Sequence, residues 1–194
     1  MKLFATARSL LSISRAHGIV RRYFVVNGFD GALTMLGLII GFMIGTPAEL
    51  SIVINACLGA AIALGVSGIS SAYISETAER QRALVQLEEA MLKDLGDSSH
   101  GVAARWVPML IALTNGAAPL LLSLFIITPL WLGNAGIPLP VAPLHGAVLT
   151  ALLIVFLLAV YLGRIAGVSW FKSGLRTLAV AFVTAGLIYL FVGG

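Results

Sequence analysis

Charged side chains are scarce in this chain: they make up 10% of its 194 residues, whereas soluble domains carry about 25%. So few charges cannot cover the surface of a water-soluble globule, which excludes a cytosolic or secreted globular enzyme and a disordered chain. The single cysteine, Cys57, excludes an intrachain disulfide framework and a cysteine-only metal site. Hydrophobic residues make up 59% of the chain, and this excess predicts an integral membrane protein surrounded by the lipid bilayer.

The hydrophobic residues gather in runs that are long enough to cross a bilayer as helices, which takes about 20 residues each. None of the runs alternates apolar and polar residues as membrane β-barrels do. Residues 106–163 contain no charged side chain, but glycines and prolines between 131 and 143 divide this stretch into two spans. We therefore predict an all-α fold with five transmembrane helices, at residues 24–44, 51–75, 107–130, 144–162 and 175–192.

The basic residues predict the orientation of these spans. All 12 lysines and arginines lie before the first span, between the second and third, or around the start of the fifth. The alternate connections and the C-terminus carry none, so the positive-inside rule predicts a cytoplasmic N-terminus and a C-terminus on the opposite side. The net charge of +4 then reflects topology and lipid headgroup contact rather than nucleic-acid binding.

Four segments follow from these patterns. Residues 1–23 place apolar side chains on one helical face and basic ones away from its centre, which predicts an amphipathic helix in the membrane interface. Residues 24–75 form the first two spans, and residues 76–105 form a cytoplasmic segment of mixed charge that begins with a helix from Glu76 to Leu95. Residues 106–194 form the last three spans.

Asp30 is the only carboxylate inside a predicted span. Intramembrane acids are costly and usually functional, and Asn27 and Thr34 lie next to it on the helix at i−3 and i+4. These residues predict a cation or proton site on a translocation path. The alternative is a carboxylate that reaches the interface or pairs with Arg21 or Arg22.

Glycines recur at every fourth position after Asp30, at Gly37, Gly41 and Gly45. Overlapping Gly-x-x-x-Gly units predict close helix packing, against another span or a second copy of the chain. If the first span faces its own copy, two Asp30 side chains come together and make a divalent-cation site from one acid per chain. Asn55 in the second span is a further polar candidate for the path, or a residue that joins helices by hydrogen bonds.

The predicted cytoplasmic helix carries several acids, which favour capture of a hard divalent cation at the mouth of a pore. The alternative is a solvated helix with favourable i,i+4 ion pairs, Glu76 with Arg80 and Glu89 with Lys93. The candidate metal ligands of this segment are Glu76, Glu79, Glu88 and Glu89.

Motifs of enzymes are missing. The sequence has no His-x-x-His or Glu-x-x-His spacing, no phosphate-binding loop and no Gly-x-Ser-x-Gly motif. With so few ionisable groups, an intramembrane enzyme would lack a base, a nucleophile pair or a metal triad. We therefore expect a protein that is not an enzyme and has no prosthetic group.

The first span has an arginine followed by a glycine, an aspartate–glycine pair and a threonine: Arg22, Gly28, Asp30, Gly31 and Thr34. In this pattern the sequence resembles the vacuolar iron transporter family, which includes nodulin-like and prokaryotic members, although the leading glycine is one residue closer to the aspartate. The stretch 60–65, Tyr73, and Glu76 with Glu79 also look like that family. The number and order of spans agree over most of the chain.

The resemblance implies a homodimer that exports ferrous iron or manganese from the cytosol in exchange for protons. It places the pore at the dimer interface, with Asp30 lining it. It makes Glu76 and Glu79 the first acids of a metal-capture helix, and Glu88 or Glu89 a later one.

The sequence departs from the family in its second span and its cytoplasmic segment. Leu64 and Ala56 stand where iron-transporting members have a methionine and an acid, and the cytoplasmic segment is short for a full capture domain. These losses favour a second hypothesis, a non-transporting membrane scaffold or regulator of the same fold. A channel or carrier for another small solute is a third.

Overall fold

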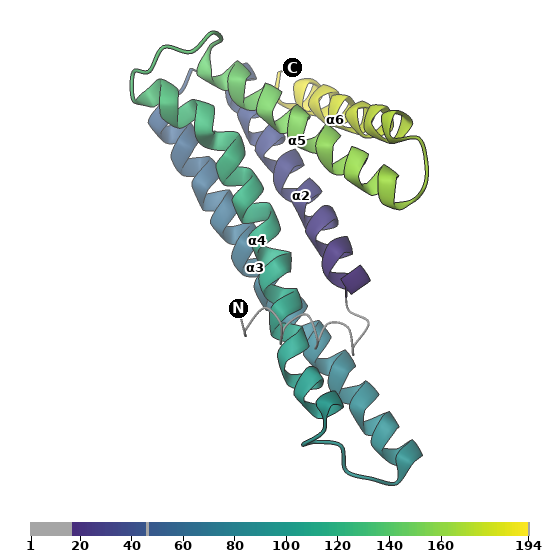
Figure 1. Cartoon of the computed structure of the whole chain (residues 1–194). Coiled ribbons are helices and arrows are strands. Elements are labelled where there is room, and N and C mark those ends of the chain that lie inside the picture. The colour runs from purple at the N-terminus through teal and green to yellow at the C-terminus, as the bar shows by residue number, and fades with distance from the viewer. Residues whose placement is uncertain (1–16, 46, 194) are drawn as a thin grey trace. The chain divides into compact units, whose positions relative to one another are not determined.

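The computed structural model describes residues 17–45 and 47–193, and the regular structure in them is helical throughout. Each of the helices that this part of the chain forms is long and apolar enough to cross a membrane, which marks the chain as an integral membrane protein. The all-α class and the predicted set of apolar helices are confirmed, whereas the side that each end faces stays a prediction. The helices are α2 (His17–Ile44), α3 (Leu50–Met91), α4 (Ser99–Asn134), α5 (Pro143–Ile165) and α6 (Trp170–Val192) (Figure 1).

The helices run through the boundaries predicted between segments. Residues 17–23 are the first turns of α2, continuous with the first span, and the rest of the predicted amphipathic helix lies outside the described residues. The second span and the predicted cytoplasmic helix together form α3, whose 42 residues extend over about 63 Å, roughly twice the thickness of a bilayer core. Part of α3 therefore has to project beyond the membrane.

Helix α3 ends earlier than the predicted Leu95. Leu92 adopts a left-handed conformation with φ of 50°, and the Lys93 amide donates to the Glu88 carbonyl oxygen at 3.2 Å. The Leu92 amide donates to the Glu89 carbonyl oxygen at 3.4 Å. Together these bonds form a Schellman motif, which satisfies the last carbonyls of the helix and turns the chain toward α4.

The chain divides into two compact units, and α2, α3 and α4 each contribute a segment to both. The first unit contains Gly65–Ala117 and, among the described residues, 17–24. In it α3 and α4 lie side by side (Figure 1). A Cβ atom added to Gly68 would lie 3.1 Å from Gly116 Cα, and the buried Asn115 side chain donates to the Gly68 carbonyl oxygen at 2.7 Å. Small residues and one interhelical hydrogen bond thus join this pair, as is common in membranes.

In the second unit, which contains Val25–Leu64 and Ala118–Gly194, α2 packs closely on α4. A Cβ atom added to Gly31 would lie 2.8 Å from Pro119 Cα, and one added to Gly28 would lie 2.9 Å from Leu122 Cδ1. These two glycines therefore allow the close approach that buries one side of α2. The largest fully buried side chains of this core are Met35, Leu36, Ile39, Val53, Ile126, Ile127, Leu130 and Val155.

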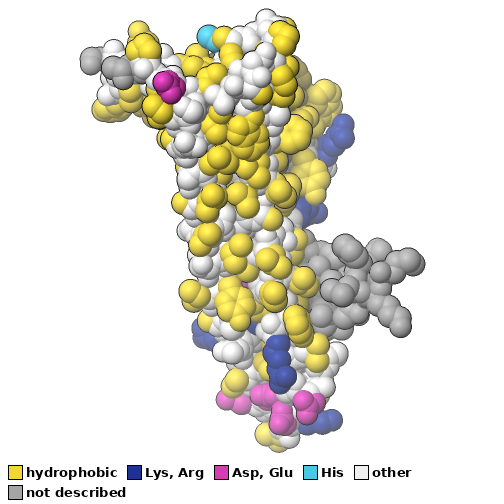
Figure 2. All heavy atoms as spheres, turned by 90° about the vertical axis from the view of Figure 1, so that its left-hand side faces the viewer, with side chains coloured by type: hydrophobic (Ala, Val, Ile, Leu, Met, Phe, Trp, Pro, Cys, Tyr) yellow, Lys and Arg dark blue, Asp and Glu magenta, His cyan; other side chains and the backbone are white. Residues whose placement is uncertain are grey.

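Helix α6 packs on α5 along a narrow contact. The Ser173 hydroxyl donates to the Ala159 carbonyl oxygen at 2.9 Å, and Gly174 and Ala181 are the buried residues of α6. The large apolar side chains of α6 are all exposed or half-buried. Hydrophobic side chains are scattered over the face drawn in Figure 2, and most of its acidic side chains gather at the α3–α4 turn.

Candidate functional site

Asp30 lies in the second unit on the side of α2 that faces away from the core. Its neighbours Gly28, Gly31 and Ala32 are buried, whereas Asp30 is exposed. At about 100° per residue, the buried Ile39 points opposite to Asp30. No ion pair or hydrogen bond ties the Asp30 carboxylate within the described chain. The close packing of α2 on α4 therefore turns Asp30, the one acid of α2, outward.

Thr34, Gly37 and Gly41 lie within about 40° of Asp30 around the helix, and we call these four residues the Asp30 face. A Cβ atom added to Gly41 would meet nothing within 4 Å, and one added to Gly37 would meet only the tip of Ile188, at 3.4 Å. Thr34 is half-buried. The Asp30 face is thus a polar and small-residue surface with little covering it inside the chain.

The other residues predicted for the path and for packing are not part of the Asp30 face. Asn27 is half-buried at about 60° from Asp30 and is engaged in an interaction of its own, and Asn55 is exposed on α3. Gly45 lies at the end of α2, where its amide donates to the Gly41 carbonyl oxygen at 3.0 Å. Within the chain, Gly28 and Gly31 rather than the later glycines make the close helix contact.

The described residues contain no group of three histidine, cysteine, aspartate or glutamate side chains that is close enough to hold a metal ion. Since hard divalent cations bind several oxygen atoms at once, a metal site at Asp30 would need ligands besides this one carboxylate. The Asp30 face is the part of α2 that is open to such ligands.

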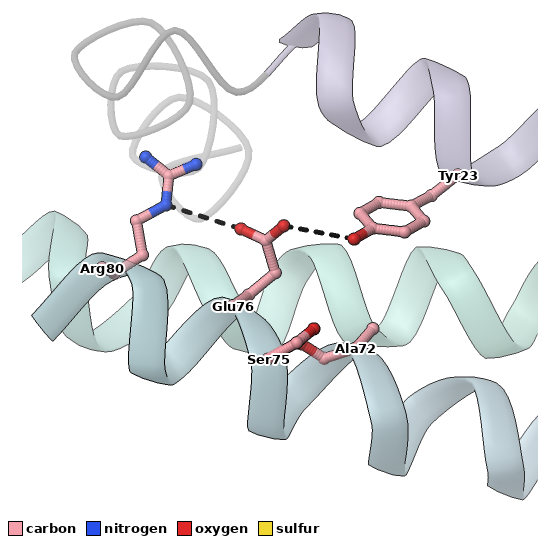
Figure 3. Close-up of polar contacts among 5 residues, drawn as sticks. All are labelled: Tyr23, Ala72, Ser75, Glu76 and Arg80. Atoms are coloured by element: carbon pink, nitrogen blue, oxygen red, sulfur yellow. Dashed lines mark hydrogen bonds and ion pairs between the residues drawn. The ribbon is translucent and has the colours of Figure 1, made fainter. Parts of the chain in front are cut away.

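Glu76, predicted as a metal ligand, is held by two neighbours in the first unit. The Tyr23 hydroxyl donates to Glu76 Oε1 at 3.4 Å, and Arg80 Nε lies 3.6 Å from Glu76 Oε2 (Figure 3). The ion pair with Arg80 was expected from the i,i+4 spacing, and it is confirmed. Tyr23 was not expected. The carboxylate thus joins the first turns of α2 to α3.

Glu88 also has a structural partner. Its Oε1 accepts a hydrogen bond from the Leu95 amide at 2.9 Å, which holds the turn between α3 and α4. Glu79 and Glu89 are exposed instead. Lys93 lies beyond the end of α3, so it has lost the helical spacing to Glu89, and no ion pair joins the two.

Sequence reasoning missed two residues that position these groups: Tyr23 and Gly31. Tyr23 and Glu76 are 53 positions apart, so no local pattern pairs them. A signal for Gly31 was present, because Gly28 and Gly31 are spaced by about one helical turn and lie at about 180° and 120° from Gly37 around the helix. Asn115 stands beside Gly116 in a charge-free span, where an amide is expected to join helices, and its hydrogen bond to Gly68 confirms this.

No family model matches the chain. A protein of Methanocaldococcus jannaschii, described as the uncharacterized protein MJ0645, is 30% identical to it over 172 residues. The aligned region covers 87% of the chain and 86% of the archaeal protein, so the likeness extends over nearly the whole membrane domain.

Proposed function

The chain belongs to the family of the archaeal protein MJ0645, whose name assigns no activity, and we propose that it transports a divalent metal cation, on the ground of Asp30 and of the resemblance of the first span to the vacuolar iron transporter family. The substrate is ferrous iron or manganese, and export from the cytosol is coupled to protons. The path lies at the interface of a homodimer and is lined by Asp30. The N-terminus is cytoplasmic, and the C-terminus is on the opposite side.

The observation that carries this proposal is the exposed carboxylate of Asp30 on a helix apolar enough to cross the membrane. A carboxylate in contact with lipid costs on the order of 3 kcal/mol at the bilayer centre. The Asp30 face of a second copy would replace that lipid with polar and small residues. Because Gly37 and Gly41 have no side chains, two such helices can approach closely across a two-fold axis.

A pair of facing Asp30 carboxylates would provide hard oxygen ligands, and the Thr34 hydroxyls would add further oxygens. Protons and divalent cations bind to the same carboxylate oxygens, so a cation that arrives between the two Asp30 side chains would compete with protons there. This competition is the physical basis of the proposed proton coupling.

The α3–α4 turn serves as the entry in this proposal. Glu79 and Glu89 are exposed, so they are available to raise the local concentration of cations. Glu76 and Glu88 are already bonded to other groups, so their role is to hold the helices in position.

Flux measurements in proteoliposomes test the proposal. The chain is reconstituted with calcein, which Mn²⁺ quenches, and with a pH-sensitive dye in parallel vesicles. Asp30→Asn removes the charge with little change in shape, and we expect it to abolish both the Mn²⁺ signal and the accompanying proton signal. Glu49→Gln removes one charge from an exposed position just before α3, so its fluxes should match those of the unchanged chain. Asp30-independent flux would contradict the proposal.

A second candidate function is a non-transporting membrane scaffold or regulator of the same fold. Leu64 and Ala56 in the second span and the absence of a three-ligand cluster in the described residues favour it. Equilibrium binding of Mn²⁺ to the detergent-solubilised dimer separates the two functions. Saturable binding that Asp30→Asn removes supports the transporter, and an intact dimer without such binding supports the scaffold.

A further inference from the structure

A groove with basic walls lies at the start of α6, with a volume of about 360 Å³. We call it the basic groove. Its position is well defined, because α6 is held on α5 by the Ser173 hydrogen bond to Ala159 and by the close contact of Gly174 with the Phe156 ring. The residues that line it are Val168, Ser169, Lys172, Ser173, Arg176 and Thr177.

The two cations of the basic groove have no acidic partner. Lys172 and Arg176 are exposed and take part in no ion pair within the described residues. The chain contains no aspartate or glutamate after Asp97, so no acid in the second half of the sequence can neutralise them. An unneutralised ammonium and guanidinium on one helix face attract an anion from outside the chain.

The hydrogen-bonding groups of the groove fit a phosphate. The Thr177 hydroxyl donates to the Ser173 carbonyl oxygen at 3.1 Å, and the Ser173 hydroxyl donates to the Ala159 carbonyl oxygen on α5, so neither is free to bind a ligand. Ser169, the N-cap residue of α6, makes no side-chain cap bond. Lys172, Arg176 and Ser169 are therefore the donors that remain, and phosphate oxygens accept from all three types.

An apolar stripe continues from the cations along the same face of α6. Val180, Val183 and Leu187 follow Arg176 at helical spacing, and all three are more than half exposed, at 53%, 62% and 52%. The rise from Arg176 to Leu187 is about 16 Å, close to half the thickness of a bilayer core. A pair of cations next to an apolar stripe as long as one leaflet is deep is complementary to the headgroup and acyl chain of an anionic phospholipid.

We propose that the basic groove is a binding site for an anionic phospholipid. Its phosphate lies against Lys172 and Arg176, and an acyl chain runs along Val180, Val183 and Leu187. The exposed aromatic rings of Trp170 and Phe171 fit the headgroup level, where such rings anchor helices. A free phosphate would use the cations alone and leave the stripe without a role.

Fluorescence quenching by brominated lipids tests this site in the full chain. Trp106→Phe and Trp131→Phe leave Trp170 as the only tryptophan, directly beside the groove. In phosphatidylcholine vesicles, brominated phosphatidylglycerol should quench Trp170 at much lower mole fractions than brominated phosphatidylcholine does. The double change Lys172→Gln with Arg176→Gln should lower this preference by roughly tenfold.

A matched control removes the same charge elsewhere. Arg82→Gln with Lys93→Gln changes two exposed basic residues near the α3–α4 turn and should keep the preference for phosphatidylglycerol. An equal loss in both double variants would overturn the site in favour of general surface charge. Displacement of the lipid by soluble glycerol phosphate would overturn it in favour of an anion site without a lipid tail. If neither brominated lipid quenches Trp170, lipid does not occupy this face and the proposal is overturned.

Discussion

At the scale of single residues, the role of a carboxylate depends on what lies next to it in space. Glu76 and Glu79 are one helical turn apart on α3 and look equivalent in the sequence. The Glu76 side chain is only 12% exposed and meets both Tyr23 and Arg80, whereas Glu79 is exposed. The first acid is therefore part of the packing of the first unit, and the second remains available to solvent cations.

This difference predicts unequal effects on stability. Glu76→Gln removes the charge that holds Arg80 and weakens the bond from Tyr23, so we expect the free energy of unfolding to fall by about 1 kcal/mol. Glu79→Gln changes an exposed side chain and should alter it by less than about 0.5 kcal/mol. Unfolding of the full chain by SDS in mixed micelles measures both variants. Equal values for the two would show that the Tyr23–Glu76–Arg80 contact does not stabilise the protein.

At the scale of the helices, α2 has two faces with opposite roles, and glycines occur on both. Gly31 is on the buried side, where an added methyl group would meet the backbone of Pro119. Gly41 is on the Asp30 face, where an added methyl group would meet nothing in the chain. A glycine therefore does not by itself indicate which face of a membrane helix is packed.

Alanine substitutions distinguish the two faces. Gly31→Ala forces α2 away from α4, and overpacking of this kind costs about 1–3 kcal/mol of the free energy of unfolding. Gly41→Ala should leave the unfolding of a single chain nearly unchanged, because its methyl group enters open space. The SDS unfolding midpoint of each variant, measured under conditions that keep the chain monomeric, compares them directly. A larger loss for Gly41→Ala would mean that this side of α2 is packed within the chain.

At the scale of the whole molecule, one chain leaves the Asp30 carboxylate exposed on a helix that is otherwise apolar enough for lipid. The cost of that exposure in lipid is the reason to expect a second copy against this face. Because Cys57 is the single cysteine and is buried, the chain is well suited to cross-linking after Cys57→Ala.

Cysteine cross-linking in membranes tests the dimer. In the Cys57→Ala background, Gly41→Cys should form a disulfide-linked dimer under mild oxidation, since disulfides require Cα atoms within about 7 Å of each other. Leu149→Cys, on an exposed position of α5, should remain monomeric on the same non-reducing gel. Cross-linking at Leu149→Cys alone would place the dimer interface on another surface.

The class of the protein and the number of its apolar helices could be predicted from the sequence. The length of an apolar run and its lack of charge are local properties, and they decide whether a segment can span a bilayer as a helix. The Glu76–Arg80 pair was predictable for the same reason, since both residues lie on one helix at i,i+4. The joining of the second span to the next helix was not predicted, because the change from apolar to charged residues near Glu76 marks a change of environment and not a break in the backbone.

Only the tertiary structure decided which side of α2 is buried. Apolar residues show almost no helical periodicity along α2, so the sequence does not distinguish a core face from an outer one. The close contact of Gly31 with Pro119 on α4 determines which side of α2 is buried, and Asp30 therefore faces outward. The engagement of Glu76 by Tyr23 and of Glu88 by the Leu95 amide likewise depends on how the chain folds back on itself, because these partners are brought together by packing and turn geometry rather than by helical spacing.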